Sequence, residues 1–161
     1  MREILEEFRR NDLLLFSFPL YCHGIPAPLK ALIDRTMPMT GAALSKADDR
    51  YEHTIREEYA HLRYLMISGC GFPNSRHNFE PAAEEFRLKF PYGHTVITIP
   101  ESTMFCIPQA SPVTEPRLEL VRKAGKQYAE TGKIEETLLE EIGSPMIPED
   151  LYIRFANDEA Q

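Results

Sequence analysis

Three short apolar segments stand out along the chain, and each ends at a residue that interrupts regular structure. They cover residues 13–18, 62–68 and 95–99, and each is followed directly by a proline or a glycine. This length and these boundaries are typical of β-strands. The first segment is apolar at nearly every position, which predicts a strand covered on both faces, as in parallel sheets between helix layers.

The segments before, between and after these strands repeat apolar residues at the spacing of a helix. The clearest stripe consists of Phe79, Ala82, Ala83, Phe86 and Phe90. We expect Asn78 to cap this helix, and Thr114 to cap a later helix that ends at Gly132. The helices predicted in this way cover residues 3–10, a segment that starts at Pro28, and residues 78–90, 114–131, 134–143 and 149–155.

Strands that alternate with helices favour an α/β fold with a parallel sheet between two helix layers. We expect a single domain over residues 1–161, with a core at 1–131 and a C-terminal helical extension at 132–161. Residues 37–60 fit neither pattern, because a break at Met37–Gly41 is followed by the polar stretch Asp48–Glu52. This part of the chain is predicted to be an excursion or a lid.

The loops after the three strands are the candidate ligand site. In parallel α/β sheets, ligands bind beyond the carboxyl ends of the strands. The loops at these ends cover residues 19–26, 69–77 and 101–112. Three prolines within Pro19–Pro28 hold the first loop extended, and the second loop is rich in glycine, so both are expected to run without regular structure.

Composition and charge exclude several function classes. The net charge of −7 argues against general binding to nucleic acid or to anionic membranes. The longest apolar run, Leu13–Cys22, is about half the ~20 residues that a membrane helix needs. The charged N-terminus does not resemble a signal peptide, so we expect a cytoplasmic protein. Cys22, Cys70 and Cys106 lie far apart, which argues against a disulfide scaffold, a zinc site or an iron–sulfur cluster.

One dense motif carries a family resemblance. Residues 18–35 read Phe-Pro-Leu-Tyr-Cys-His-Gly-Ile-Pro-Ala-Pro-Leu-Lys-Ala-Leu-Ile-Asp-Arg. This segment resembles the NADPH-dependent FMN reductase and iron–sulfur flavoprotein branch of the flavodoxin-like proteins, where it follows the third strand and its loop packs along the flavin ring. The later stretch Gly69–Phe72 is similar to the next flavin loop of that family. The resemblance implies a flavodoxin-like three-layer α/β/α fold and FMN as the cofactor.

The resemblance also implies which residues contact the cofactor. They are Pro19, Leu20, Tyr21, Cys22, His23 and Gly24 in the first loop, and Gly69, Cys70, Gly71 and Phe72 in the second. NAD(P)H is the implied electron donor, and no catalytic side chain is expected, because the flavin itself carries the redox chemistry. Other interpretations stay open: a packing role for Tyr21, a tight turn at Gly69 and Gly71, and a small buried side chain for Cys70.

One departure from the family lowers the expected affinity for FMN. Family members start with a strand and a phosphate-binding loop, whereas Met1 here lies in the helix that comes before the motif. We therefore expect an N-terminally truncated form with about three of the usual five strands and weak FMN binding. Each lost charge-assisted hydrogen bond to the phosphate accounts for roughly 1.5–3 kcal/mol. The strand at residues 13–18 is expected to expose an open edge.

Two classes of function follow from these observations. The first is an FMN-dependent NAD(P)H oxidoreductase, similar to flavin or quinone reductases, or a flavodoxin-type electron-transfer domain. The second is a remnant without catalysis that acts as a dimerisation or interaction module, or a fragment of a longer flavoprotein. We expect a homodimer, because an open strand edge favours pairing between chains. The small-molecule electron acceptor remains open.

Overall fold

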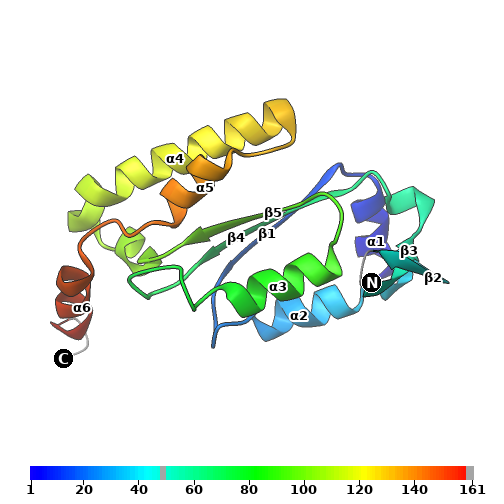
Figure 1. Ribbon diagram of the computed structural model, residues 1–161, viewed down its shortest axis with the longest axis horizontal. Coiled ribbons are helices and arrows are strands. Elements are labelled where there is room, and N and C mark those ends of the chain that lie inside the picture. Colours follow the sequence, from blue (N-terminus) through cyan, green and yellow to red (C-terminus); the bar gives the residue numbers. More distant parts are fainter. Residues whose placement is uncertain (48–49, 159–161) are drawn as a thin grey trace.

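A parallel three-stranded sheet forms the centre of the protein (Figure 1). The computed structural model describes residues 1–47 and 50–158. The strands are β1 (Leu13–Pro19), β4 (Arg63–Gly69) and β5 (His94–Ile99), in the order β1-β4-β5. Leu15 pairs with Leu65, and Ile67 pairs with Ile97. The three predicted strands are confirmed, and they are direct neighbours, as the order of a flavodoxin-like sheet requires.

Helices cover both faces of the sheet, with α2 and α3 on one face and α4 and α5 on the other (Figure 1). The helix bounds are α1 (Arg2–Arg9), α2 (Ala27–Asp34), α3 (Glu80–Lys89), α4 (Ser111–Thr131), α5 (Glu136–Gly143) and α6 (Glu149–Asp158). Short 3₁₀ turns cover Met37–Met39, Glu57–Tyr59, Ser102–Cys106 and Pro108–Ala110. The α/β architecture and the C-terminal helical extension are as predicted.

Both predicted helix caps are wrong. The residue before α3 is Phe79, and the side-chain amide of Asn78 instead donates to the carbonyl oxygens of Asn74 and Arg76. Thr114 is buried inside α4, which starts three residues earlier at Ser111. The predicted end of α4 is confirmed, because Gly132 adopts a left-handed conformation (φ +72°), where glycine is favoured.

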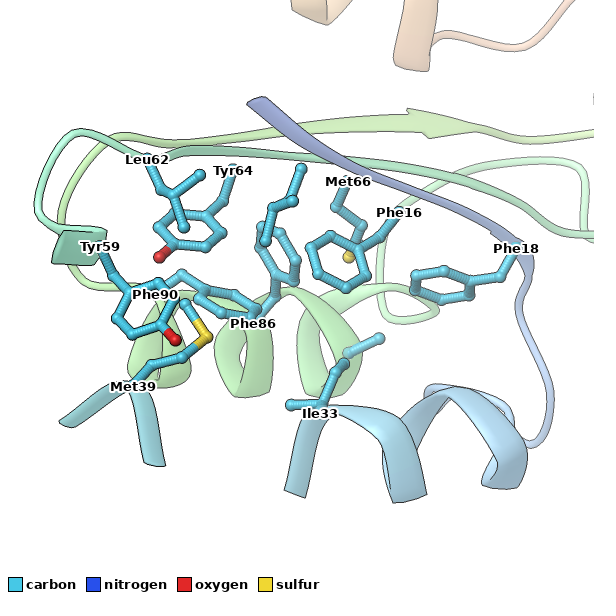
Figure 2. Close-up of a cluster of buried hydrophobic side chains, with 12 residues drawn as sticks. Phe16, Phe18, Ile33, Met39, Tyr59, Leu62, Tyr64, Met66, Phe86 and Phe90 are labelled. Carbon is cyan, nitrogen blue, oxygen red and sulfur yellow. The ribbon is translucent and has the colours of Figure 1, made fainter. Parts of the chain in front are cut away.

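The main core lies between the sheet and the α2–α3 layer (Figure 2). Phe16 of β1 meets the ring of Phe86 edge to face, with ring centroids 5.5 Å apart. Tyr64 of β4 stacks on Phe90, with centroids 4.2 Å apart. Each such pair contributes about 0.5–1.5 kcal/mol beyond the burial of its area. The helical stripe predicted for residues 78–90 is therefore the side of α3 that holds this layer against the sheet.

The opposite face of β1 is only partly covered. A second cluster, with Leu65, Ile97 and Tyr128, packs β4 and β5 against α4 and α5. Leu15 lies on the same face as its pairing partner Leu65, yet 54% of its surface is exposed. The prediction that the first strand is covered on both faces is thus wrong. The reason is its position at the sheet edge, where the second cluster covers Leu13 in part but leaves Leu15 open.

The segment predicted as an excursion or lid contains a β-hairpin. Its strands are β2 (Thr40–Ala47) and β3 (Arg50–Ile55), which pair antiparallel. The hairpin lies next to α1, at the end of the molecule away from α6 (Figure 1). Of the stretch predicted to be polar and solvated, Asp48 and Asp49 lie outside the described residues, and Tyr51 is exposed on β3.

Candidate functional site

The two loops that were predicted to contact a flavin leave the sheet side by side. Pro19, the last residue of β1, pairs with Gly69, the last residue of β4. The backbone N–H of Leu20 donates to the carbonyl oxygen of Gly69 over 2.8 Å. The loops 19–24 and 69–72 therefore start from one point at the carboxyl end of the sheet, where parallel α/β proteins bind their ligands.

The tip of the first loop is a tight turn. Tyr21 and Gly24 exchange two backbone hydrogen bonds, 2.9 and 3.2 Å long. Cys22 and His23 between them both have positive φ angles, of 49° and 63°. Two successive left-handed residues are the signature of a type I′ turn. The turn holds the side chains of Tyr21, Cys22 and His23 at the surface.

The two loops touch through a pair of rings. The imidazole of His23 stacks on the phenyl ring of Phe72, with centroids 5.6 Å apart and planes 4° from parallel. His23 Nδ1 also donates to the carbonyl oxygen of Asn78, at 3.3 Å. Sequence reasoning placed both residues in the site but did not foresee this contact, because it joins positions about 50 residues apart.

Packing within the protein explains the two glycines of the second loop. A Cβ atom at Gly69 would lie 2.7 Å from the Cβ and Oγ atoms of Ser102, closer than real Cβ contacts allow. A Cβ at Gly71 would lie 3.3 Å from Thr103 Cγ2. Neither glycine has a positive φ. Close packing against the Ser102–Cys106 turn therefore accounts for both glycines.

Cys70 is a buried packing residue. Its side chain is almost fully covered, and this burial raises the pKa of its thiol. A raised pKa keeps the thiol protonated, so Cys70 lacks the thiolate that redox chemistry needs. Cys22 is the exposed cysteine of the site, and all three cysteines are free thiols.

The C-terminal extension covers the second loop, which sequence reasoning did not predict. The hydroxyl of Tyr152, on α6, donates to the carbonyl oxygen of Gly71 at 2.9 Å. The hydroxyl oxygens of Tyr152 and Thr103 also lie 2.9 Å apart, so Thr103 is the donor in that bond. Tyr152 is buried, which raises the pKa of its phenol and keeps it protonated as a donor. Through Tyr152, the C-terminal extension thus fixes the backbone of the second loop at Gly71.

Two buried charged groups anchor the extension beside this contact. Glu101 follows β5 in a left-handed conformation (φ +56°), and its Oε2 accepts the backbone N–H of Met146. Arg117, on α4, donates to the carbonyl oxygens of Ile142 and Ser144. Burial is the main influence on both groups, and it raises the pKa of Glu101 and lowers that of Arg117. These contacts fix the chain between α5 and α6.

The exposed side chains at the loop tips fit a flat aromatic ligand. Tyr21 is 63% exposed and Phe72 is 45% exposed, although both are large and apolar. Aromatic side chains that stay exposed next to backbone amides are suited to the ring of a flavin, which has apolar faces and a polar edge. Arg76 and His77, later in the second loop, are exposed as well. In the described part of the chain, no cluster of three or more metal-ligating side chains occurs.

Comparison with known proteins identifies the family. A family model for the flavodoxin-like fold matches residues 1–99, which is more than half of the chain. The chain therefore belongs to this flavodoxin-like family, as the motif at residues 18–35 predicted. A comparison with curated proteins finds no match. Within the described residues, no helix has the length and apolar character needed to cross a membrane.

Two solved structures illustrate the likeness. One is an FMN-dependent NADH-azoreductase from Bacillus anthracis str. Ames Ancestor in complex with FMN, with 16% identity and a TM-score of 0.47 over 63% of this chain. The other is described as a candidate quinone reductase from Klebsiella pneumoniae, with 20% identity and a TM-score of 0.39 over 62% of this chain. The chain spans 50% and 42% of the length of these two proteins.

Proposed function

We propose that the protein is a flavin oxidoreductase domain that uses FMN and takes electrons from NAD(P)H, in the manner of a flavin or quinone reductase. The observation that carries this proposal is the meeting of the loops 19–24 and 69–72 at the carboxyl end of the sheet, joined by the stack of His23 on Phe72. Membership of the flavodoxin-like family supports it. The proposal includes a flavodoxin-type electron-transfer domain, in which the bound flavin would pass electrons on without reducing a small-molecule substrate.

In this proposal the chain positions the flavin, and the bound flavin supplies the redox chemistry. Backbone groups of Pro19–Gly24 and Gly69–Phe72 would line the ring, and the exposed rings of Tyr21 and Phe72 would flank it. Cys70 contributes packing beneath the second loop. No side chain is assigned as an acid or base. NAD(P)H as donor agrees with the cytoplasmic location that the sequence suggests.

The visible spectrum of the purified protein tests this proposal. The protein is titrated with FMN while the flavin absorption bands are recorded, because weakly bound cofactor would be lost on gel filtration. A saturable change of these bands, and protein-dependent bleaching by NADH or NADPH without oxygen, are the expected results and identify the donor. Flavin bands that the protein leaves unchanged contradict the proposal.

A specific observation favours the non-catalytic role as a second candidate. Within the described residues, no strand pairs with the outer edge of β1, and Leu15 beside it is 54% exposed. Open edges with exposed apolar residues favour pairing with another chain. In this candidate the β1 strands of two copies form a homodimer interface. Light scattering tests it: Leu15→Lys should convert a dimer to a monomer, and a monomeric native protein contradicts it.

A further inference from the structure

Glu101 is an acidic residue that the fold encloses completely. It follows the last residue of β5 by two positions, and none of its surface is exposed. Its backbone adopts a left-handed conformation (φ +56°), which is uncommon for a residue other than glycine. Such a conformation persists only where the surrounding structure fixes it, and it is concentrated at functional sites. The contacts that fix Glu101 come from two separate parts of the chain.

Glu101 connects the second loop to the C-terminal extension. Its backbone N–H donates to the carbonyl oxygen of Phe72 over 2.9 Å. The backbone N–H of the next residue, Ser102, donates to the carbonyl oxygen of Cys70 over 2.8 Å. On the other side, the Oε2 atom of Glu101 accepts the backbone N–H of Met146, which belongs to the extension. The loop backbone at the proposed flavin site is therefore connected to the extension through Glu101.

The second carboxyl oxygen of Glu101 has no such contact. Within the described residues, Oε1 is buried and lacks a hydrogen-bond partner. Because buried polar groups are nearly always hydrogen-bonded, a negative charge on this oxygen is poorly stabilised. Burial accordingly raises the pKa of Glu101 and favours the neutral form while the extension is in place. Ionisation of Glu101 therefore favours an arrangement in which the segment at Met146 moves away and admits water to Oε1.

The charged and titratable groups around this carboxyl group come from three helices and the second loop. On α4, Arg117 favours the ionised form of Glu101, but its guanidinium also donates to backbone carbonyl oxygens of the extension. Glu141 of α5 is a second acid near Arg117. Tyr152 of α6 and Cys70 of the second loop are neutral, because burial raises the pKa of both. Glu101 is therefore the buried group of this cluster whose charge changes between about pH 4.5 and neutrality.

We propose that Glu101 is a positioning residue of the flavin site, which holds the extension against the second loop when protonated and releases it when ionised. This inference rests on the proposed flavin site. Release of the segment at Met146 loosens α6, so Tyr152 no longer holds the carbonyl group of Gly71. The backbone that lines the flavin ring then becomes mobile. Since the protonated form binds the ring more tightly, the affinity is highest at low pH and falls as the pH rises through the pKa of folded Glu101.

Fluorescence titration of riboflavin at a series of pH values tests this proposal. Riboflavin carries the same ring as FMN but lacks the phosphate, which itself titrates near about pH 6. We expect the ratio of dissociation constants, native protein over Glu101→Gln, to rise by roughly fivefold or more between about pH 5 and about pH 8. The variant keeps an oxygen that can accept from Met146 but cannot ionise. The titration of His23 at the loop tip is common to both proteins and cancels in the ratio.

Two further variants assign the effect to Glu101. Glu84→Gln removes an exposed carboxylate of α3 whose lowered pKa places its titration below this pH range, so the affinity of this variant should follow the native profile. Tyr152→Phe cuts the link to Gly71 and should weaken the pH dependence. It serves as the second variant if Glu101→Gln fails to fold.

The outcomes separate the role of Glu101 from the proposed function. Saturable binding with the same pH profile in the native protein and in Glu101→Gln overturns this role and leaves the flavin site standing. An equal change of profile in Glu84→Gln overturns it as well, and so does an unchanged profile in Tyr152→Phe. Absence of riboflavin binding at every pH contradicts the flavin site itself and, with it, the role of Glu101.

Discussion

The phenol hydroxyl of Tyr152 donates a hydrogen bond to the carbonyl oxygen of Gly71, although the two residues are 81 positions apart in the chain. This bond joins the last helix to the second loop of the proposed flavin site. Thr103 donates to the same phenol oxygen, so the contact joins three segments. The C-terminal extension is therefore a structural part of the site, because it holds the backbone that would line the cofactor.

Replacement of Tyr152 by phenylalanine tests this coupling. The ring stays in place, but the hydroxyl and both of its hydrogen bonds are lost. We expect the free energy of unfolding to fall by roughly 1–2 kcal/mol, because each buried hydrogen bond contributes about 1 kcal/mol. Denaturant unfolding measures this change. The matched control is Tyr51→Phe, since Tyr51 is exposed on the hairpin. Equal stability of the two variants contradicts the coupling.

The close approach between Gly69 and Ser102 gives a second prediction. Gly69→Ala adds a Cβ that would lie 2.7 Å from Ser102, so we expect a destabilisation of about 1–3 kcal/mol from overpacking. Gly24→Ala is the control, because its Cβ would meet its nearest neighbour at an ordinary 3.6 Å. The double variant Gly69→Ala, Ser102→Gly should recover part of the loss. Thermal unfolding of all three variants checks this, and a tolerated Gly69→Ala contradicts it.

The buried carboxyl of Glu101 predicts a pH effect on stability. Burial raises the pKa of Glu101 above its value in the unfolded chain. A raised pKa means that the folded state binds the proton of Glu101 more tightly than the unfolded chain does. The stabilisation from this proton is therefore fully present at low pH, and it is lost as the pH rises through the folded pKa.

Glu101→Gln removes this titration and keeps a side-chain oxygen that can accept from the Met146 N–H. We therefore expect the stability of the variant, relative to the native protein, to increase as the pH rises from about 4.5 towards neutrality. Urea unfolding at a series of pH values measures the difference. Glu84→Gln is an exposed control: the lowered native pKa of Glu84 places its pH effect, of opposite sign, below about pH 4.5, so its difference should stay nearly flat from there to neutrality. If the difference in free energy of unfolding between Glu101→Gln and the native protein does not change with pH, the raised pKa of Glu101 is contradicted.

The strands and the two loops could be predicted because their signals are local. A run of apolar residues that ends at Pro19 or at Gly69 marks both a strand and the loop after it. The rule that parallel strands present their carboxyl ends at one edge then brings the loops together. The hairpin at Thr40–Ile55 escaped prediction because most of its residues are exposed on both faces, so hydrophobic alternation is weak.

The parts that could not be predicted depend on contacts between distant residues. The need for glycine at position 69 comes from Ser102, and the cover over Gly71 comes from Tyr152. Nothing in the sequence near either glycine reveals these neighbours. The predicted caps at Asn78 and Thr114 were wrong for a related reason: both side chains are taken up by loop or helix packing, so the backbone starts each helix without them.

Fluorescence titration of FMN with the purified protein tests the central claim most directly, namely that the loops 19–24 and 69–72 form a flavin-ring site. The native protein should quench FMN fluorescence in a saturable way. Tyr21→Ala and Phe72→Ala should each weaken binding roughly three- to tenfold, as expected for the loss of one aromatic contact. Tyr51→Ala, which removes an exposed tyrosine far from the loops, should not. Absence of saturable quenching, or equal affinities for all four proteins, contradicts the account.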